Sequence, residues 1–65
     1  MLKQEIIEKI KTNAPLKLEL MQENKKSQYT IERWLKQNNK KLSEFANLSI
    51  IGNHLSVSNI NQLLQ

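Results

Sequence analysis

The 65-residue chain contains no cysteine and no aspartate, a single glycine, a single proline and only three aromatic residues. Without cysteine, neither disulfides nor a thiolate metal site can stabilise the fold. The scarcity of glycine and proline argues against a β fold rich in tight turns, whereas the abundant Leu, Ile, Lys, Glu and Gln favour helices. At this length about 60% of the unfolded chain's surface is buried on folding. We therefore expect a single domain over residues 1–65 with a small core.

Membrane segments and catalytic motifs are also missing from the sequence. No apolar run approaches the ~18 residues of a membrane span, and the first residues alternate charge with isoleucine, unlike a signal peptide. His54 is the only histidine and has neither a ligand set for zinc nor a nucleophile to serve, so we expect it at the surface or at a helix end. Gly52 alone cannot form a glycine-rich phosphate loop. We expect a cytoplasmic protein with no membrane contact, no enzymatic activity, no cofactor and no metal.

The spacing of apolar residues predicts an all-α fold, a compact bundle of four to five short helices. The first helix is expected over 2–12 and the second from about Pro15 to Glu23, with Leu18 off its apolar stripe and either in contact with another helix or exposed. A fourth helix is expected over 44–54, capped by Ser43, and a short last helix should follow Ser58 as its N-cap. The apolar face of the fourth helix would comprise Phe45, Leu48, Ile51 (or Ile50) and Leu55.

The third helix, over residues 27–38, separates most clearly into two faces. Ser27 is a natural N-cap, and Asn38-Asn39 can adopt the left-handed conformation that ends a helix. At about 100° per residue, one arc holds Thr30, Ile31, Trp34 and Leu35, which we expect to pack on the bundle. The opposite, polar arc holds Gln28, Tyr29, Glu32, Arg33, Lys36 and Gln37.

The string Ser-Gln-Tyr-Thr-Ile-Glu-Arg-Trp-Leu at 27–35 resembles the recognition helix of Cro/repressor-type helix-turn-helix proteins of phages and bacteria. The likeness covers about Leu16–Asn38, which gives a motif over about 15–38, and extends loosely to Leu55. It implies a helix-turn-helix that offers Gln28, Tyr29, Glu32 and Arg33 to DNA bases and buries Thr30, Ile31 and Leu35. Excisionase-like winged helices share Thr-Ile-x-Arg-Trp-Leu, but 39–49 lacks their glycine-turned hairpin.

Four positions depart from the pattern of that family. Lys25 stands where the turn usually has glycine, Asn24 and Lys26 stand where apolar residues are usual, and Met21 stands where a small residue is usual. Two alternatives follow: either the turn is remodelled or the resemblance is partly accidental.

Positive charge is concentrated around the third helix. Residues 25–41 hold six bases and one acid, a net charge of +5, whereas the remainder carries −1. A localised basic patch is typical of a protein that binds the phosphate backbone of nucleic acid. The expected phosphate contacts are Lys25, Lys26, Ser27, Lys36, Lys40 and Lys41.

Each residue expected at the bases has an alternative role. Gln28 can pair bidentately with adenine or be simply solvated; Arg33 can bind guanine or phosphate, or pair with Gln37. Tyr29 either contacts a thymine methyl or phosphate, or packs on the second helix. Glu32 either accepts from cytosine or orients Arg33, and we favour the second role.

These patterns favour a sequence-specific, double-stranded DNA-binding transcriptional regulator of phage or mobile-element type. One helix covers few base pairs, so a homodimer is expected, with Leu55, Ile60, Leu63 and Leu64 either at its interface or in the core. The alternative is a protein-interaction module (an inhibitor, an antitoxin or a transcription adaptor), suggested by Asn24, Lys25 and Glu32. A third hypothesis is a non-specific nucleic-acid coater.

Overall fold

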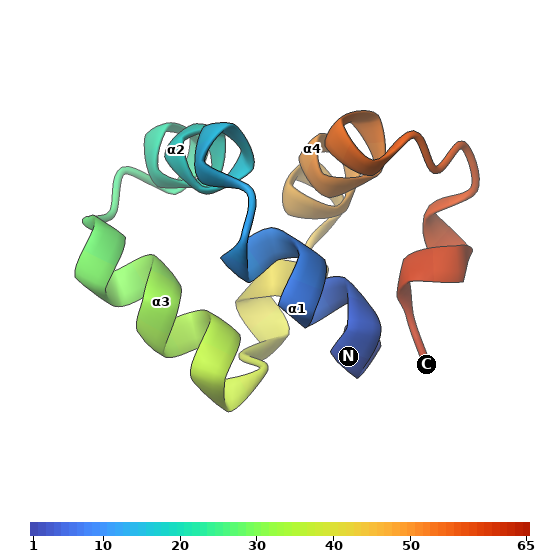
Figure 1. The fold of residues 1–65 in the computed structure, drawn as a ribbon, viewed down its shortest axis with the longest axis horizontal. Helices are drawn as coiled ribbons and strands as arrows, with labels where there is room; N and C mark the ends of the chain where they lie inside the picture. Colours follow the sequence, from blue (N-terminus) through green and yellow to red (C-terminus); the bar gives the residue numbers. More distant parts are fainter.

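The computed structural model describes all of residues 1–65 and shows a bundle built only of helices (Figure 1). The all-α prediction is confirmed. None of the helices is both long and apolar enough to cross a bilayer. The elements, in chain order, are α1 (Gln4–Lys11), α2 (Ala14–Asn24), α3 (Gln28–Gln37), the 3-10 helix η1 (Lys40–Ser43), α4 (Phe45–Leu55) and the 3-10 helix η2 (Ile60–Leu63).

One apolar cluster holds these elements together. Its fourteen buried side chains come from every helix: Leu2, Ile6, Ile7, Ile10, Leu16, Leu20, Ile31, Trp34, Leu35, Leu42, Leu48, Ile50, Ile51 and Leu63. Leu55, Ile60 and Leu64 are half-buried against it, so the apolar C-terminal residues serve the core. Leu18, in contrast, is exposed.

The first residues of the chain pair with the last ones. Leu2 forms an antiparallel bridge with Leu64, and the Lys3 N–H donates to the Leu63 carbonyl at 2.9 Å. The prediction of a helix from residue 2 is therefore wrong by two residues, because this backbone is hydrogen-bonded to the C-terminal segment instead. The two chain ends consequently lie side by side (Figure 1).

The turn between α2 and α3 accommodates Lys25 by an unusual backbone conformation. Lys25 has φ 54° and ψ 45°, in the left-handed region for which glycine is the usual residue. The N–H groups of both Lys25 and Lys26 donate to the carbonyl of Met21, which closes the end of α2. Lysine thus takes the conformation expected of the family's glycine, at a steric cost of about 1 kcal/mol.

The angle between α2 and α3 is fixed by this turn. In Figure 1, α2 is viewed nearly along its axis while α3 runs across the view, so the two helices cross. Asn13 is the N-cap of α2, since its side chain accepts the N–H of Leu16 at 3.1 Å. Helix, three-residue turn and crossed helix together form the predicted helix-turn-helix plan.

A pair of asparagines joins α2 to α4. The Asn24 Nδ2 donates to Asn47 Oδ1 at 2.8 Å, and the Asn47 Nδ2 donates to Asn24 Oδ1 at 3.2 Å. Asn47 is 1% exposed and also donates to the carbonyl of Lys41 at 2.8 Å. The asparagine at 24, where the family prefers an apolar residue, therefore has a buried polar partner on another helix.

The face of α4 differs from the one predicted. Phe45 was expected in the core, but its side chain is 74% exposed. Asn47 lies about 200° round the helix from Phe45, so burying Asn47 with Leu48 and Ile51 turns Phe45 to solvent.

Ser43 and Ser58, the two N-caps predicted in the C-terminal half of the chain, are also wrong. Ser43 ends η1, and Glu44 precedes α4 without a capping side-chain bond. Asn59 rather than Ser58 caps the last helix, since its Oδ1 accepts the Asn61 N–H at 3.0 Å. His54 does lie at a helix end, and its Nε2 is 2.7 Å from Glu19 Oε1 on α2.

Replacing Lys25 by glycine should stabilise the fold, because glycine adopts the left-handed conformation without steric cost. We expect a gain of about 0.5–1 kcal/mol in the free energy of unfolding. At this chain size, 1 kcal/mol raises the melting temperature by roughly 4–8 °C. Lys26→Gly is the matched control and should destabilise, since Lys26 does not have a positive φ. Equal melting temperatures for the two variants would contradict the assignment of strain to Lys25.

Truncating either asparagine of the pair should destabilise the protein. Asn47→Ala leaves the Asn24 Oδ1 without a donor and the Lys41 carbonyl with only the N–H of Glu44, at a cost of about 1–3 kcal/mol. In denaturant titrations, the double variant Asn24→Ala/Asn47→Ala should lose less free energy of unfolding than the two single variants lose together. The difference, which is the coupling energy of the pair, should be about 0.5–3 kcal/mol. Asn53→Ala, an exposed asparagine of the same helix, should change stability little. Additive losses would show that the pair is not coupled.

Candidate nucleic-acid interface

Helix α3 presents one face to the bundle and the opposite face to solvent, as its pattern predicted. Ile31, Trp34 and Leu35 are buried, and Trp34 is only 5% exposed. Thr30, expected to be buried, is only half-buried. The polar residues that remain exposed are Gln28, Tyr29, Glu32, Arg33, Lys36 and Gln37.

Both ends of α3 are capped as expected. The Ser27 Oγ accepts the Thr30 N–H at 3.3 Å, and Asn38 ends the helix with φ 48° in the left-handed region. Asn38 also donates from Nδ2 to the carbonyl of Leu2 at 2.8 Å, which ties this end of α3 to the N-terminal segment. The position of α3 is thus fixed at its C-terminal end as well as along its apolar face.

Of the predicted phosphate contacts, Lys36 lies within α3 and the other lysines flank the helix at its two ends. Lys25 and Lys26 lie in the turn before it, and Lys40 and Lys41 lie in η1 after it. All four side chains are exposed. Because a ten-residue helix is about 15 Å long, these lysines form two separate basic groups rather than one cluster.

An open hollow on the outer face of α3 is lined by Tyr29, Glu32, Arg33 and Lys36. The Arg33 guanidinium carbon lies 5.8 Å from the centre of the Tyr29 ring, a distance at which a cation–π attraction acts. Tyr29 is 74% exposed, so it does not pack on α2. Tyr29 and Arg33 therefore form a cation–π pair that faces solvent.

Glu32 is bonded to two residues, neither of which is Arg33. Its Oε2 accepts from the Gln28 Nε2 at 2.6 Å and lies 3.9 Å from the Lys17 Nζ on α2. The expectation that Glu32 orients Arg33 is therefore wrong. The carboxylate instead connects the start of α3 to α2.

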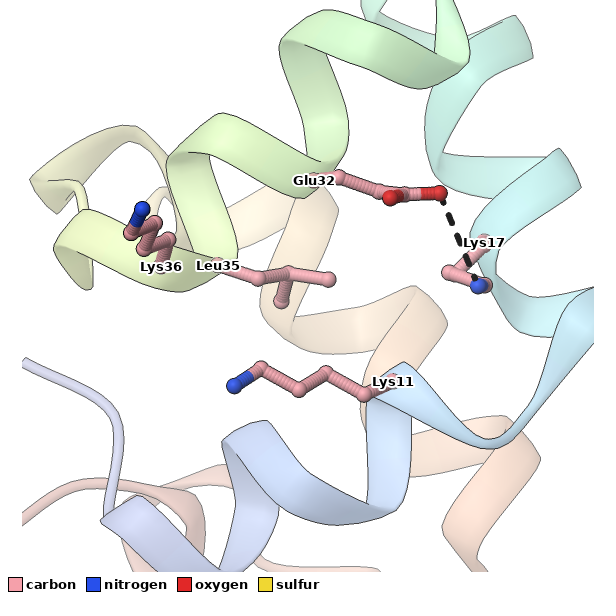
Figure 2. Close-up of a pocket in the computed structure, with 5 residues that line it drawn as sticks. All are labelled: Lys11, Lys17, Glu32, Leu35 and Lys36. Carbon is pink, nitrogen blue, oxygen red and sulfur yellow. Dashed lines mark ion pairs between the residues drawn. The ribbon is translucent and has the colours of Figure 1, made fainter.

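A second hollow, of about 410 Å³, lies where α1, α2 and α3 meet (Figure 2). Lys11, Lys17 and Lys36 come from these three helices, and Glu32 is the one acid among the lining residues. Lys11 is also 3.4 Å from Glu8 Oε2. The arrangement gives this hollow an excess of positive charge, which suits it to bind an anion such as a phosphate.

Lys11 and Lys17 were not among the predicted site residues. Residues 1–24 hold as many acids as bases, so charge counted along the chain does not mark these two lysines. They reach α3 only because α1 and α2 fold against it.

No family model, curated protein or solved structure matches the chain. The resemblance of residues 16–38 to Cro/repressor-type proteins therefore stays a prediction from the sequence.

Proposed function

We propose that the protein is a sequence-specific DNA-binding transcriptional regulator of phage or mobile-element type, with α3 as the helix that enters the major groove. The observation that carries this proposal is the division of α3 into a buried apolar face and an exposed face of amide, phenol and guanidinium groups. A helix of 10–12 Å diameter fits a major groove about 12 Å wide, where such groups can reach base edges.

The basic groups around α3 support this orientation. With α3 in the groove, the lysines before and after it lie where the phosphates on either side of the groove would be. Lys36 forms a third basic group with Lys11 and Lys17, whose charges are partly offset by Glu8 and Glu32. Phosphate contacts of this kind position a protein on DNA, while base contacts give its specificity. The localised charge of residues 25–41 therefore acts together with the outer face of α3.

Gln28 is held in a defined orientation for base recognition. A carboxylate only accepts hydrogen bonds, so the amino group of Gln28 must point toward Glu32. The second N–H and the carbonyl oxygen of the same amide stay free, and together they match N7 and the N6 amino group of adenine. Lys17 offsets the negative charge of Glu32, which would otherwise be repelled by phosphate.

Fluorescence anisotropy over a salt series tests the proposal, with duplexes selected from a random library and unselected duplexes. Affinity should fall steeply with salt, by a slope of about −0.9 in log K against log salt for each phosphate contact. Arg33→Ala should cost about 1–3 kcal/mol on the selected site and little on random DNA. Lys36→Ala should weaken binding to both alike and reduce the slope by about 1.

Lys9→Ala is the matched control, because Lys9 is an exposed lysine of α1 outside both hollows on α3. It should leave the salt slope near the wild-type value. A flat salt response, or no binding at low salt, would overturn the proposal. Equal affinity for selected and random duplexes would indicate a non-specific coater instead.

Glu32→Ala should reduce the preference for adenine at the base pair that Gln28 contacts, because the amide is then free to rotate. We expect a loss of about tenfold in discrimination at that pair, since a bidentate contact contributes about 1–3 kcal/mol. Glu32→Gln should restore most of it, because its carbonyl can still accept from Gln28. Competition binding with single-base variants of the selected site measures this. Undiminished adenine preference in Glu32→Ala would show that Glu32 does not position Gln28.

A small protein-interaction module is the second candidate function. The departures at Asn24 and Lys25 no longer favour it, because both residues have structural roles, but the carboxylate of Glu32 on an otherwise basic face still does. Capture of a stoichiometric acidic protein partner, together with weak DNA binding, would favour this function over the first.

A further inference from the structure

The C-terminal third of the chain has no formally charged side chain. From Phe45 to Gln65 there is no Lys, Arg, Asp or Glu side chain, so the side-chain net charge of +4 lies entirely on residues 1–44. The one titratable side chain in this part, His54, is bonded to Glu19 on α2. The surface formed by α4 and η2 therefore differs in kind from the basic surface around α3.

An open groove of about 360 Å³ lies on this uncharged surface. Phe45, whose side chain is 74% exposed, is one of the residues that line it. Gly52 lets the segment after α4 approach the helix closely, since a Cβ there would lie 2.9 Å from the Val57 carbonyl oxygen. The remaining lining residues are Ser49, Asn53, Val57, Ser58 and Ile60, none of them charged.

We propose that the groove between α4 and η2 is the docking surface for a second copy of this chain, with Phe45 of each copy in the groove of the other. In a two-fold interface the same patch of both copies meets, so the exposed ring of Phe45 in one copy can contact Val57 and Ile60 in the groove of the other. Two molecules of net charge +4 repel each other wherever their basic faces meet. The uncharged face is the surface on which they can approach without that repulsion.

The positions of the helices agree with this arrangement. In Figure 1, α4 and η2 lie on the right, whereas α3 lies at the lower left. Docking through the α4–η2 surface thus leaves the outer face of α3 free in both copies. A standard interface buries about 800 Å² per partner, roughly a fifth of the 4234 Å² surface of this molecule.

Sedimentation equilibrium from about 10 μM to 1 mM protein, without DNA, tests the proposal. The wild-type chain should show a concentration-dependent monomer–dimer equilibrium with no larger species, because a two-fold contact closes at two copies. Phe45→Glu and Asn53→Glu should each raise the dissociation constant by about tenfold or more, since they bring a charge into the interface.

Tyr29→Glu is the matched control. Tyr29 is also 74% exposed, it also lies in the first turn of its helix, and the substitution changes the net charge equally. It should leave dimerisation unchanged, and circular dichroism should show that all three variants are folded. A wild-type chain that stays monomeric, one that forms larger assemblies, or a Tyr29→Glu effect equal to that of Phe45→Glu would overturn the proposal. DNA binding is absent from the assay, so its outcome is independent of the proposed function.

Discussion

The reciprocal hydrogen bonds between Asn24 and Asn47 constrain the bundle more narrowly than its apolar contacts do. Apolar side chains can repack with small losses when helices shift. An amide pair at 2.8 and 3.2 Å is satisfied in only one placement of α2 against α4, and a misplaced pair leaves buried polar groups that each cost about 1–3 kcal/mol. Asn24 is also the last residue of α2, so this constraint acts directly before the turn that directs α3.

The placement of α2 and the turn after it determine which face of α3 is exposed. The left-handed Lys25 turns the chain, Ser27 begins the next helix, and Trp34 with Ile31 and Leu35 sets its rotation about its own axis. The side chains that then face outward are those whose chemistry suits base edges and phosphates. The orientation of the candidate interface is thus determined by residues that do not belong to it.

Much of this arrangement could be predicted from local sequence. The rotation of α3 and both of its caps follow from helical periodicity and from the preferences of Ser and Asn, because each depends on neighbours within one or two turns. Phe45 and Asn47 could not be assigned correctly in the same way. An apolar residue in a periodic stretch is normally buried, and only the partner at residue 24, on another helix, makes an asparagine the more favourable core residue of α4. The bridge of Leu2 to the far end of the chain was equally inaccessible to local patterns.

The residues of the candidate interface also divide into those that local sequence predicts and those that it does not. The outer face of α3 was predictable because it lies on one helix, whereas Lys11 and Lys17 join it only through the packing of α1 and α2. The partner of Glu32 was also misassigned, since Arg33 is adjacent in sequence but Lys17 is closer in space.

The hydrogen bonds between residues 1–3 and 63–65 carry a consequence for the order in which the bundle folds. The amide of Lys3 bonds to the carbonyl of Leu63, and the carbonyl of Met1 accepts from Gln65. These partners are 60 and 64 residues apart in sequence, so this edge of the bundle forms only when the most distant segments of residues 1–65 meet. Helices α1 to α4 can assemble earlier through contacts closer in sequence, and contacts between residues so distant in sequence are the slower ones to form. Residues 1–3 and 63–65 should accordingly be the last to become ordered when the bundle folds.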